Sequence, residues 1–136
     1  MTKAISISKF SELYKSNEHL NILDVREDFE YEKGHIPGAK SKPLSTFPVE
    51  LDKEKTYYVI CQSGGRSVGA CQMLTQKGYD VINVEGGMSA WRGEMDNENE
   101  KKKVKKQFWI VFAIFMVIVG SLVLFYLILS TLNFFY

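Results

Sequence analysis

The stretch YYVICQSGGRS, residues 57–67, joins an apolar, β-prone run to a helical pattern that continues to Lys77. A strand, a tight loop with two glycines and a helix together direct several backbone N–H groups, and the positive end of the helix, toward one small site. Cys61 stands at the beginning of this loop. Because amide groups and a helix N-terminus stabilise an anion, the sequence predicts a thiol that ionises more readily than a free cysteine.

On both sides of this stretch, short apolar runs alternate with segments of helical spacing. We expect strands near residues 4–7, 21–26, 39–42, 57–60 and 81–84, and helices near residues 8–14, 28–33, 66–77 and 88–91, with Ser8 or Ser11 as the cap of the first helix. Strands that alternate with helices form parallel pairs. The order therefore predicts an α/β fold, in which helices cover both faces of a parallel sheet.

The second predicted strand ends in two charged residues, Asp24 and Arg26. In open α/β sheets, ligands gather at the carboxyl ends of the strands. We interpret Asp24 and Arg26 as supporting residues that brace this edge of the sheet rather than as groups that contact a substrate.

Charge is distributed unevenly along the 136 residues. The first 95 residues carry 12 Lys and Arg against 13 Asp and Glu, whereas five lysines lie within residues 101–106. A nearly neutral domain lacks the basic surface that nucleic acids require, so we expect no nucleic-acid partner.

The chain has two cysteines, Cys61 and Cys71. Their spacing is not that of metal ligands, and two thiols are too few for a disulfide framework, so we expect no metal site. Cys71 shares a helical face with Val68 and Leu74 and is interpreted as a core residue. A role as a resolving thiol for Cys61 is the alternative.

Residues 108–136 contain no charged residue. About 20 apolar residues cross a bilayer, so this segment predicts one transmembrane helix, with aromatic residues (Phe108, Trp109, Phe134, Phe135 and Tyr136) at its two ends. We expect a domain over residues 1–95 and a charged linker over residues 96–107, which is either flexible or a helix that continues into the membrane. Lysines directly before the span place the domain in the cytoplasm.

Four motifs occur in order: Asp24-Val25-Arg26-Glu27, then Gly34-His35-Ile36-Pro37-Gly38-Ala39, then CQSGGRS at residues 61–67, then EGGMSAW at residues 85–91. Together they resemble a single-domain rhodanese, a member of a sulfurtransferase family, over residues 4–93. The resemblance implies a five-stranded parallel sheet flanked by helices, and a catalytic Cys61 that accepts a sulfane sulfur as a persulfide. With its tail, the chain is similar to the membrane-anchored bacterial rhodaneses, which implies a single-pass protein of the inner (cytoplasmic) membrane.

Loop length distinguishes two chemistries within this fold. Here four residues separate Cys61 from Arg66, whereas the related arsenate reductases and dual-specificity phosphatases have one residue more. A tighter loop suits a single extra sulfur, and a wider one suits a tetrahedral oxyanion. The sequence therefore favours sulfur transfer from thiosulfate or a persulfide to cyanide or a thiol, with no cofactor.

The predicted substrate-binding residues are the rest of the loop: Gln62, Ser63, Gly64, Gly65, Arg66 and Ser67. Their amides are expected to stabilise the terminal sulfur of the persulfide. Arg66 either attracts an anionic donor or pairs with a carboxylate. Gln62 occupies a position that is often basic in thiosulfate-using rhodaneses, so a persulfide donor is as plausible as thiosulfate. We interpret His35 as a structural hydrogen-bonding residue, with proton transfer as the alternative.

A second hypothesis uses the same thiol without turnover. A readily ionised Cys61 would be oxidised or nitrosated readily, or would carry a persulfide, and the membrane helix would bring this redox sensor or carrier to a membrane protein partner.

Overall fold

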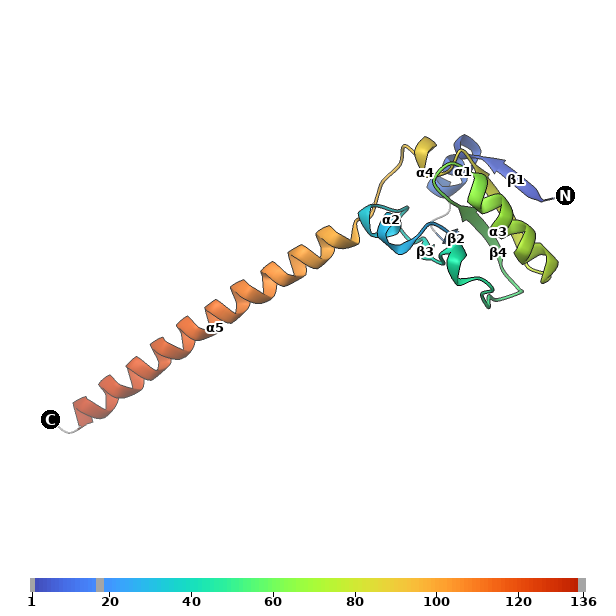
Figure 1. Ribbon diagram of the computed structural model, residues 1–136. Coiled ribbons are helices and arrows are strands. Elements are labelled where there is room, and N and C mark those ends of the chain that lie inside the picture. Colours follow the sequence, from blue (N-terminus) through green and yellow to red (C-terminus); the bar gives the residue numbers. More distant parts are fainter. Residues whose placement is uncertain (1, 17–18, 135–136) are drawn as a thin grey trace. The chain divides into compact units, whose positions relative to one another are not determined.

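The computed structural model describes residues 2–16 and 19–134, which fall into two compact units, residues 1–98 and 99–136 (Figure 1). The elements of the first unit are β1 (Lys3–Ser6), α1 (Ile7–Ser16), β2 (Asn21–Asp24), α2 (Asp28–Lys33), β3 (Lys40–Ser41), a short 3-10 helix (Leu44–Thr46), β4 (Thr56–Ile60), α3 (Gly65–Gln76), β5 (Asp80–Glu85) and α4 (Gly87–Ala90). A long helix, α5 (Glu98–Phe134), follows.

The five strands form one sheet in the order β1-β5-β4-β2-β3, and every neighbouring pair is parallel. This confirms the predicted sheet. Leu23 lies beside Val59, and Asp24 lies beside Ile60. The register therefore brings the carboxyl ends of β2 and β4 to the same edge of the sheet. Asp24 is the last residue of β2, and Cys61 directly follows β4.

A cluster of buried side chains covers each face of the sheet. The strands contribute to both clusters, because successive side chains of a strand point to opposite faces. On β4, Val59 packs into the cluster beneath α3, whereas Ile60 packs into the cluster that contains Phe10 of α1. The α3 cluster consists of Leu23, Val25, Val49, Tyr57, Val59, Cys61, Ala70, Cys71, Leu74, Tyr79 and Val81. The opposite cluster consists of Phe10, Ile22, Ile36, Ala39, Ile60, Val84, Met88 and Trp91.

Two predicted boundaries were wrong by a few residues. Helix α1 begins at Ile7, and the backbone N–H of Lys9 donates to Ser6 Oγ at 3.3 Å, so Ser6 takes the role expected of Ser8 or Ser11. Strand β2 ends at Asp24 rather than residue 26. There the Asp24 carboxylate accepts the backbone N–H of Arg26 at 3.0 Å, which turns the chain out of the sheet.

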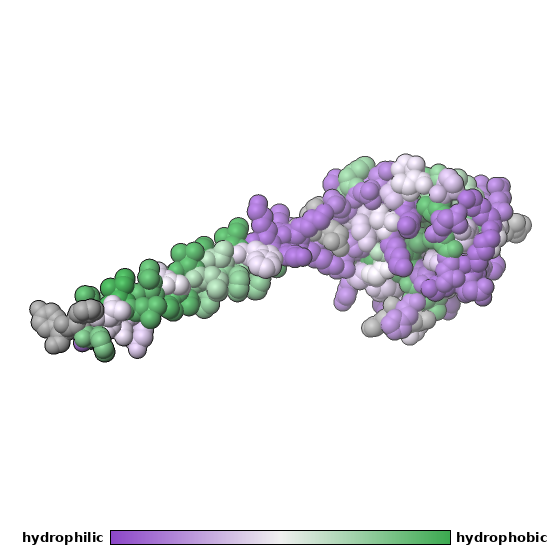
Figure 2. All heavy atoms as spheres, turned by 90° about the horizontal axis from the view of Figure 1, so that it is seen from below, coloured by the Kyte–Doolittle hydropathy of each residue, from purple (hydrophilic) through white to green (hydrophobic). Residues whose placement is uncertain are grey.

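Helix α5 is long and apolar, as the sequence predicted. Residues Glu100–Phe134 meet the length and hydropathy of a membrane span, and no other helix among the described residues does. Figure 2 shows hydrophobic side chains along the visible face of this helix beyond its hydrophilic first turns. The charged residues 101–106 are helical, so this part of the expected linker is not irregular chain. The predicted terminal aromatic residues Phe135 and Tyr136 lie outside the described residues.

Candidate active site

Cys61 follows β4 directly and is only 1% exposed. The loop after it returns over the sulfur: the backbone N–H of Gly64 donates to Cys61 Sγ at 3.1 Å. Gly64 has φ +103°, a conformation that side-chain-bearing residues rarely adopt, and this permits the tight return. Helix α3 begins at the next residue, so the sulfur also lies near a helix N-terminus.

Ser67 is the second residue that contacts the sulfur. Its fully buried Oγ lies 3.4 Å from Cys61 Sγ and donates to the Gly64 carbonyl oxygen at 3.0 Å. Burial alone would raise the pKa of the Cys61 thiol. Hydrogen bonds from the Ser67 hydroxyl and from the backbone amides of Ser67, Gly64 and Ser63 outweigh burial and hold this pKa below its ordinary value. The loop therefore makes the Cys61 thiol easier to ionise than a free cysteine.

Cys71 lies in a different environment, although it is on the same helix as Ser67. It is fully buried in the α3 cluster. Burial, together with the charge of Cys61, raises the pKa of Cys71 to about 12. A thiol that stays protonated at neutral pH is a poor nucleophile, so Cys71 fits the core role that its helical position predicts.

Arg66 pairs with a carboxylate, which is one of its two predicted roles. Its Nη1 and Nη2 atoms donate to the two carboxylate oxygens of Glu30 on α2, at 2.6 and 2.8 Å. The hydrogen bonds from Arg66 lower the pKa of Glu30 to about 2. Such bidentate pairs are among the stronger charge-assisted contacts, and this one ties α3 to α2.

Asp24 and Arg26 form a buried ion pair at the edge of the sheet. Arg26 Nη2 donates to Asp24 Oδ2 at 2.7 Å and to the Gly34 carbonyl oxygen at 2.8 Å. The two residues are 0% and 4% exposed. A buried pair with several further hydrogen bonds braces the surrounding backbone, and the supporting role expected of these two residues stays a prediction.

Gln62 is exposed and links the loop to two neighbouring elements. Its Oε1 accepts from Arg26 Nη1 at 3.4 Å, and its Nε2 donates to Ser89 Oγ of α4 at 3.1 Å. Of the other predicted loop residues, Ser63, Gly64 and Ser67 direct their backbone amides toward the Cys61 sulfur. Gln62 therefore orients the loop.

Three further residues were missed by sequence reasoning. Glu30 accepts the hydrogen bonds of Arg66, and Ser89 accepts that of Gln62. Gly87 lets α4 approach the loop so closely that the backbone N–H of Met88 donates to the Cys61 carbonyl oxygen at 2.9 Å. A Cβ on Gly87 would collide with the carbonyl oxygens of Cys61 and Gln62. The Glu27-x-x-Glu30 spacing of a capping box was visible in the sequence, but its link to Arg66 was not.

His35 lies in the turn after α2 and is 2% exposed. Its Nδ1 lies 2.9 Å from the Tyr31 carbonyl oxygen, and its ring stacks on that of Tyr31 with 3.6 Å between the centroids. The backbone of His35 also pairs with that of Asp96. These contacts agree with the structural role expected of His35.

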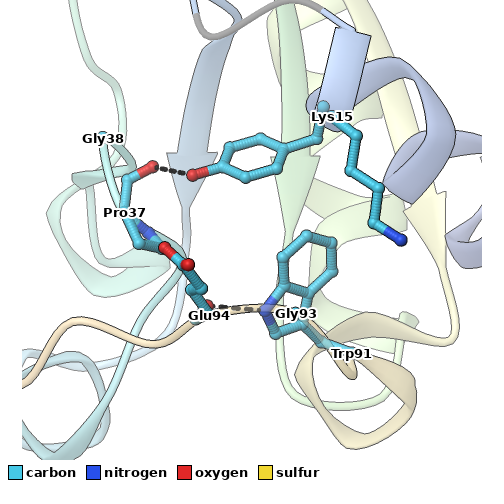
Figure 3. A pocket seen from close by; sticks show the side chains of 7 residues that line it. Lys15, Pro37, Gly38, Trp91, Gly93 and Glu94 are labelled. Carbon is cyan, nitrogen blue, oxygen red and sulfur yellow. Dashed lines mark hydrogen bonds between the residues drawn. The ribbon is translucent and has the colours of Figure 1, made fainter.

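A pocket of about 260 Å³ borders the loop and is lined by Arg26, Glu30, Lys33, Gly34, Gln62 and Met95. A larger pocket of about 520 Å³ lies between Lys15 of α1, Pro37 after α2, and Trp91 after α4 (Figure 3). No residue of the Cys61 loop lines this larger pocket, so we assign the candidate substrate entrance to the smaller one. Across residues 2–16 and 19–134, no group of three His, Cys, Asp or Glu side chains is placed to hold a metal ion.

The chain is similar to known proteins over most of its first unit. The rhodanese-like domain family matches residues 6–94. YtwF of Bacillus subtilis (strain 168), named for sulfurtransferase activity, is 42% identical over 100 residues, which are 71% of this chain and 97% of YtwF. YrkF of the same organism, named for a sulfur-carrier role, is 44% identical over 96 residues, 68% of this chain and 52% of YrkF.

The fold agrees with this relationship. The crystal structure of a rhodanese-like domain protein from Staphylococcus aureus superposes with a TM-score of 0.65 at 36% identity, and covers 70% of this chain and 97% of that chain. A family match over most of the domain, close relatives and a shared fold agree with the four motifs and with the loop around Cys61. The chain therefore belongs to the rhodanese family of single-domain, sulfurtransferase-related proteins.

Proposed function

We propose that the protein is a membrane-anchored sulfurtransferase that carries a sulfane sulfur on Cys61. The observation that supports this most strongly is the position of Cys61 Sγ, which receives the Gly64 N–H at 3.1 Å and lies 3.4 Å from Ser67 Oγ. A small anionic sulfur in this position meets amide and hydroxyl donors on one side and buried side chains on the other.

The first step is a displacement at sulfur. The Cys61 thiolate forms a bond to the outer sulfur of the donor, and the sulfur–sulfur bond of the donor breaks. The electron pair of that bond leaves with sulfite when the donor is thiosulfate, or with a thiolate when the donor is a persulfide. One sulfur–sulfur bond forms and one breaks, so no oxidant or reductant is needed.

The second step returns Cys61 to its starting form. A thiolate or cyanide attacks the terminal sulfur of the Cys61 persulfide, and the electron pair of the bond that breaks returns to Cys61. The amides of Ser63, Gly64 and Ser67 stabilise negative charge on sulfur in both states of the enzyme. These fixed donors need no rearrangement during the reaction.

A second candidate function is a carrier or sensor without significant turnover. The lowered pKa of Cys61 suits oxidation and nitrosation as well as sulfur transfer, because all of them begin at the thiolate. The likeness to YrkF, named for a sulfur-carrier role, is the observation that favours a carrier.

The two candidates differ in their rates. The full chain in detergent is given thiosulfate or cysteine persulfide with excess cyanide, and both thiocyanate and the mass of Cys61 are followed. Repeated cycles of thiocyanate formation, lost in Cys61→Ser, support the sulfurtransferase. A single persulfide per chain with slow release supports the carrier. No persulfide with either donor would refute both forms of sulfur transfer.

The membrane location is part of the same proposal. The catalytic domain spans residues 1–95, residues 96–107 link it to the anchor, and residues 108–136 cross the inner membrane once with the domain in the cytoplasm. The five lysines directly before the apolar segment support this orientation. A reporter fused after residue 136 is expected outside the cytoplasm, and one fused before residue 1 inside; the reverse result would contradict the orientation.

A further inference from the structure

The loop around Cys61 has two arginines beside it, and each is paired with a carboxylate. Arg26 is bound by Asp24, and Arg66 is bound by Glu30 through both of its terminal nitrogens. At the position directly after Cys61, the chain has the uncharged Gln62. The charges of the two arginines are therefore each offset by a carboxylate, and the amides and the end of α3 supply positive potential at the sulfur.

Negative groups other than Glu30 also lie near the Arg66 guanidinium. The charges of Glu30, Cys61 and Glu27 all raise the pKa of Arg66, which places all three near its guanidinium. Glu27 also accepts from Ser45 Oγ at 2.9 Å, so its carboxylate is held at this end of α2. Lys33, at the other end of α2, lies over the Phe29 ring at 5.6 Å. Lys33 also lines the pocket beside the loop, so among the cations of this pocket it alone has no carboxylate partner within the described residues, whereas Arg26 and Arg66 are each bound by one.

From this arrangement we propose that Glu30 is a specificity-determining residue, which neutralises Arg66 and thereby directs the Cys61 site toward persulfide donors and away from dianionic donors such as thiosulfate. The inference rests on the proposed sulfur-transfer function and names the substrate class of the same site.

Geometry explains why the pair would resist an incoming anion. The two hydrogen bonds, 2.6 and 2.8 Å long, occupy the Arg66 nitrogens that an oxyanion would otherwise use. A sulfonate group could contact Arg66 only through its remaining N–H groups or by displacing the Glu30 carboxylate, which is also held by the backbone N–H of Glu27 at 3.0 Å. The reacting end of a persulfide R–S–SH carries no oxygen atoms, so its outer sulfur can reach Cys61 with no oxyanion directly attached to that sulfur.

The transfer itself balances with this donor class. The Cys61 thiolate bonds to the outer sulfur of R–S–SH, the sulfur–sulfur bond of the donor breaks, and its electron pair leaves with R–S⁻. The proton stays on the transferred sulfur, so that Cys61 becomes R′–S–SH. The total charge is the same before and after.

The test uses the full chain in detergent, with two donors of different charge. Thiosulfate carries two negative charges, whereas cysteine persulfide carries a net charge of about −1 at neutral pH, because its ammonium group offsets its carboxylate. The rate of persulfide formation on Cys61 is measured with each donor for the wild-type protein, for Glu30→Gln and for the control Glu54→Gln, which removes the same charge before β4, at the opposite edge of the sheet from Cys61. Glutamine is acceptable at the third position of a capping box, so the start of α2 is preserved.

We expect Glu30→Gln to raise the thiosulfate rate relative to the persulfide rate about tenfold, the effect of one newly uncompensated charge near a protein surface. The gain should shrink as salt is added. Glu54→Gln should leave the ratio unchanged. A double variant, Glu30→Gln with Arg66→Gln, should bring the ratio back toward that of the wild type, because the freed charge is gone.

Other results distinguish the role of Glu30 in donor choice from the proposed sulfur-transfer function. If Glu30→Gln leaves the donor ratio unchanged while persulfide still forms, this inference is overturned and the proposed function stands. If the wild-type protein forms no persulfide from either donor, the proposed function falls and the inference with it. Should Glu30→Gln unfold, salt titration of the wild type decides: a thiosulfate rate that falls steeply with salt would mean that Arg66 attracts the donor, and a flat or rising rate supports masking.

Discussion

The hydroxyl oxygen of Ser67 lies 3.4 Å from the sulfur of Cys61, and both residues are buried. The Ser67 hydroxyl donates to the Gly64 carbonyl oxygen at 3.0 Å. A hydroxyl has one proton, so it can turn to the sulfur only by leaving that carbonyl. Ser67 is therefore the side chain that responds to the charge on Cys61.

Ser67→Ala removes the only side-chain donor that contacts the Cys61 sulfur among the described residues. We expect the pKa of Cys61 to rise, because a donor to the thiolate is lost while burial remains. Alkylation of Cys61 by iodoacetamide as a function of pH measures this shift, with Ser11→Ala on α1 as the control. An unchanged alkylation profile would show that the backbone amides alone set the acidity of the thiol.

Glu30 should make folding stability depend on pH in the acid range. Its pKa is lowered from 4.5 to about 2, so the ion pair stabilises the folded state fully above pH 4.5, and this contribution is lost as the pH falls toward 2. The side chains of Arg66 and Glu30 are 37% and 20% exposed, so solvent screening limits the contribution to about 1 kcal/mol. Urea unfolding of wild type and Glu30→Gln should differ at pH 6 and converge near pH 2. Equal differences at both pH values would contradict this assignment.

Cys71 should be dispensable for sulfur transfer. It is fully buried and its pKa is about 12, so Cys71→Ala is expected to leave the persulfide yield on Cys61 unchanged. The small cavity left in the α3 cluster should lower the free energy of unfolding by about 1 kcal/mol. Mass spectrometry of the persulfide and a thermal melt measure the two effects. A loss of persulfide turnover in a stably folded Cys71→Ala would indicate a resolving role after all.

Gly87→Ala should displace the backbone of the Cys61 loop where α4 contacts it. Gly87 has φ +57°, and an added Cβ would collide with the carbonyl oxygens of Cys61 and Gln62. We expect persulfide formation to slow about tenfold or more, because a small displacement of a catalytic group is costly. Gly69→Ala on α3 is the matched control, since its added Cβ would meet nothing within 4 Å. Equal rates for the two variants would mean that α4 does not position the loop.

Much of the fold followed from local pattern. The alternation of Val59 and Ile60 between two faces, and the strand–loop–helix order around Cys61, are properties of neighbouring residues, so the sequence predicted the parallel sheet and its edge. The end of β2 was misplaced because the Asp24 carboxylate turns the chain at Arg26, which the apolar pattern does not record. The cap at Ser6 was missed because Ser6 is also the last residue of a strand.

The candidate site was predictable only where its residues are adjacent in the chain. Cys61 and the amides of its loop come from one continuous stretch, whereas the partner of Arg66 is 36 residues away on α2. A pairing between Arg66 and some carboxylate was one of two open roles, but several carboxylates were available, and only the fold selects Glu30. The same holds for Ser89, which reaches Gln62 from 27 residues away.

The most direct test of the account is the chemical state of Cys61 in the protein taken from its own membrane. The intact chain is alkylated during lysis, and the mass of the peptide that contains Cys61 is measured by mass spectrometry before and after reduction. We expect a fraction of Cys61 to carry one extra sulfur between its own sulfur and the alkyl group, and to lose this sulfur on reduction. A Cys61 found only as free thiol or as oxygen-oxidised forms, even after exposure to thiosulfate and persulfide donors, would contradict the central claim.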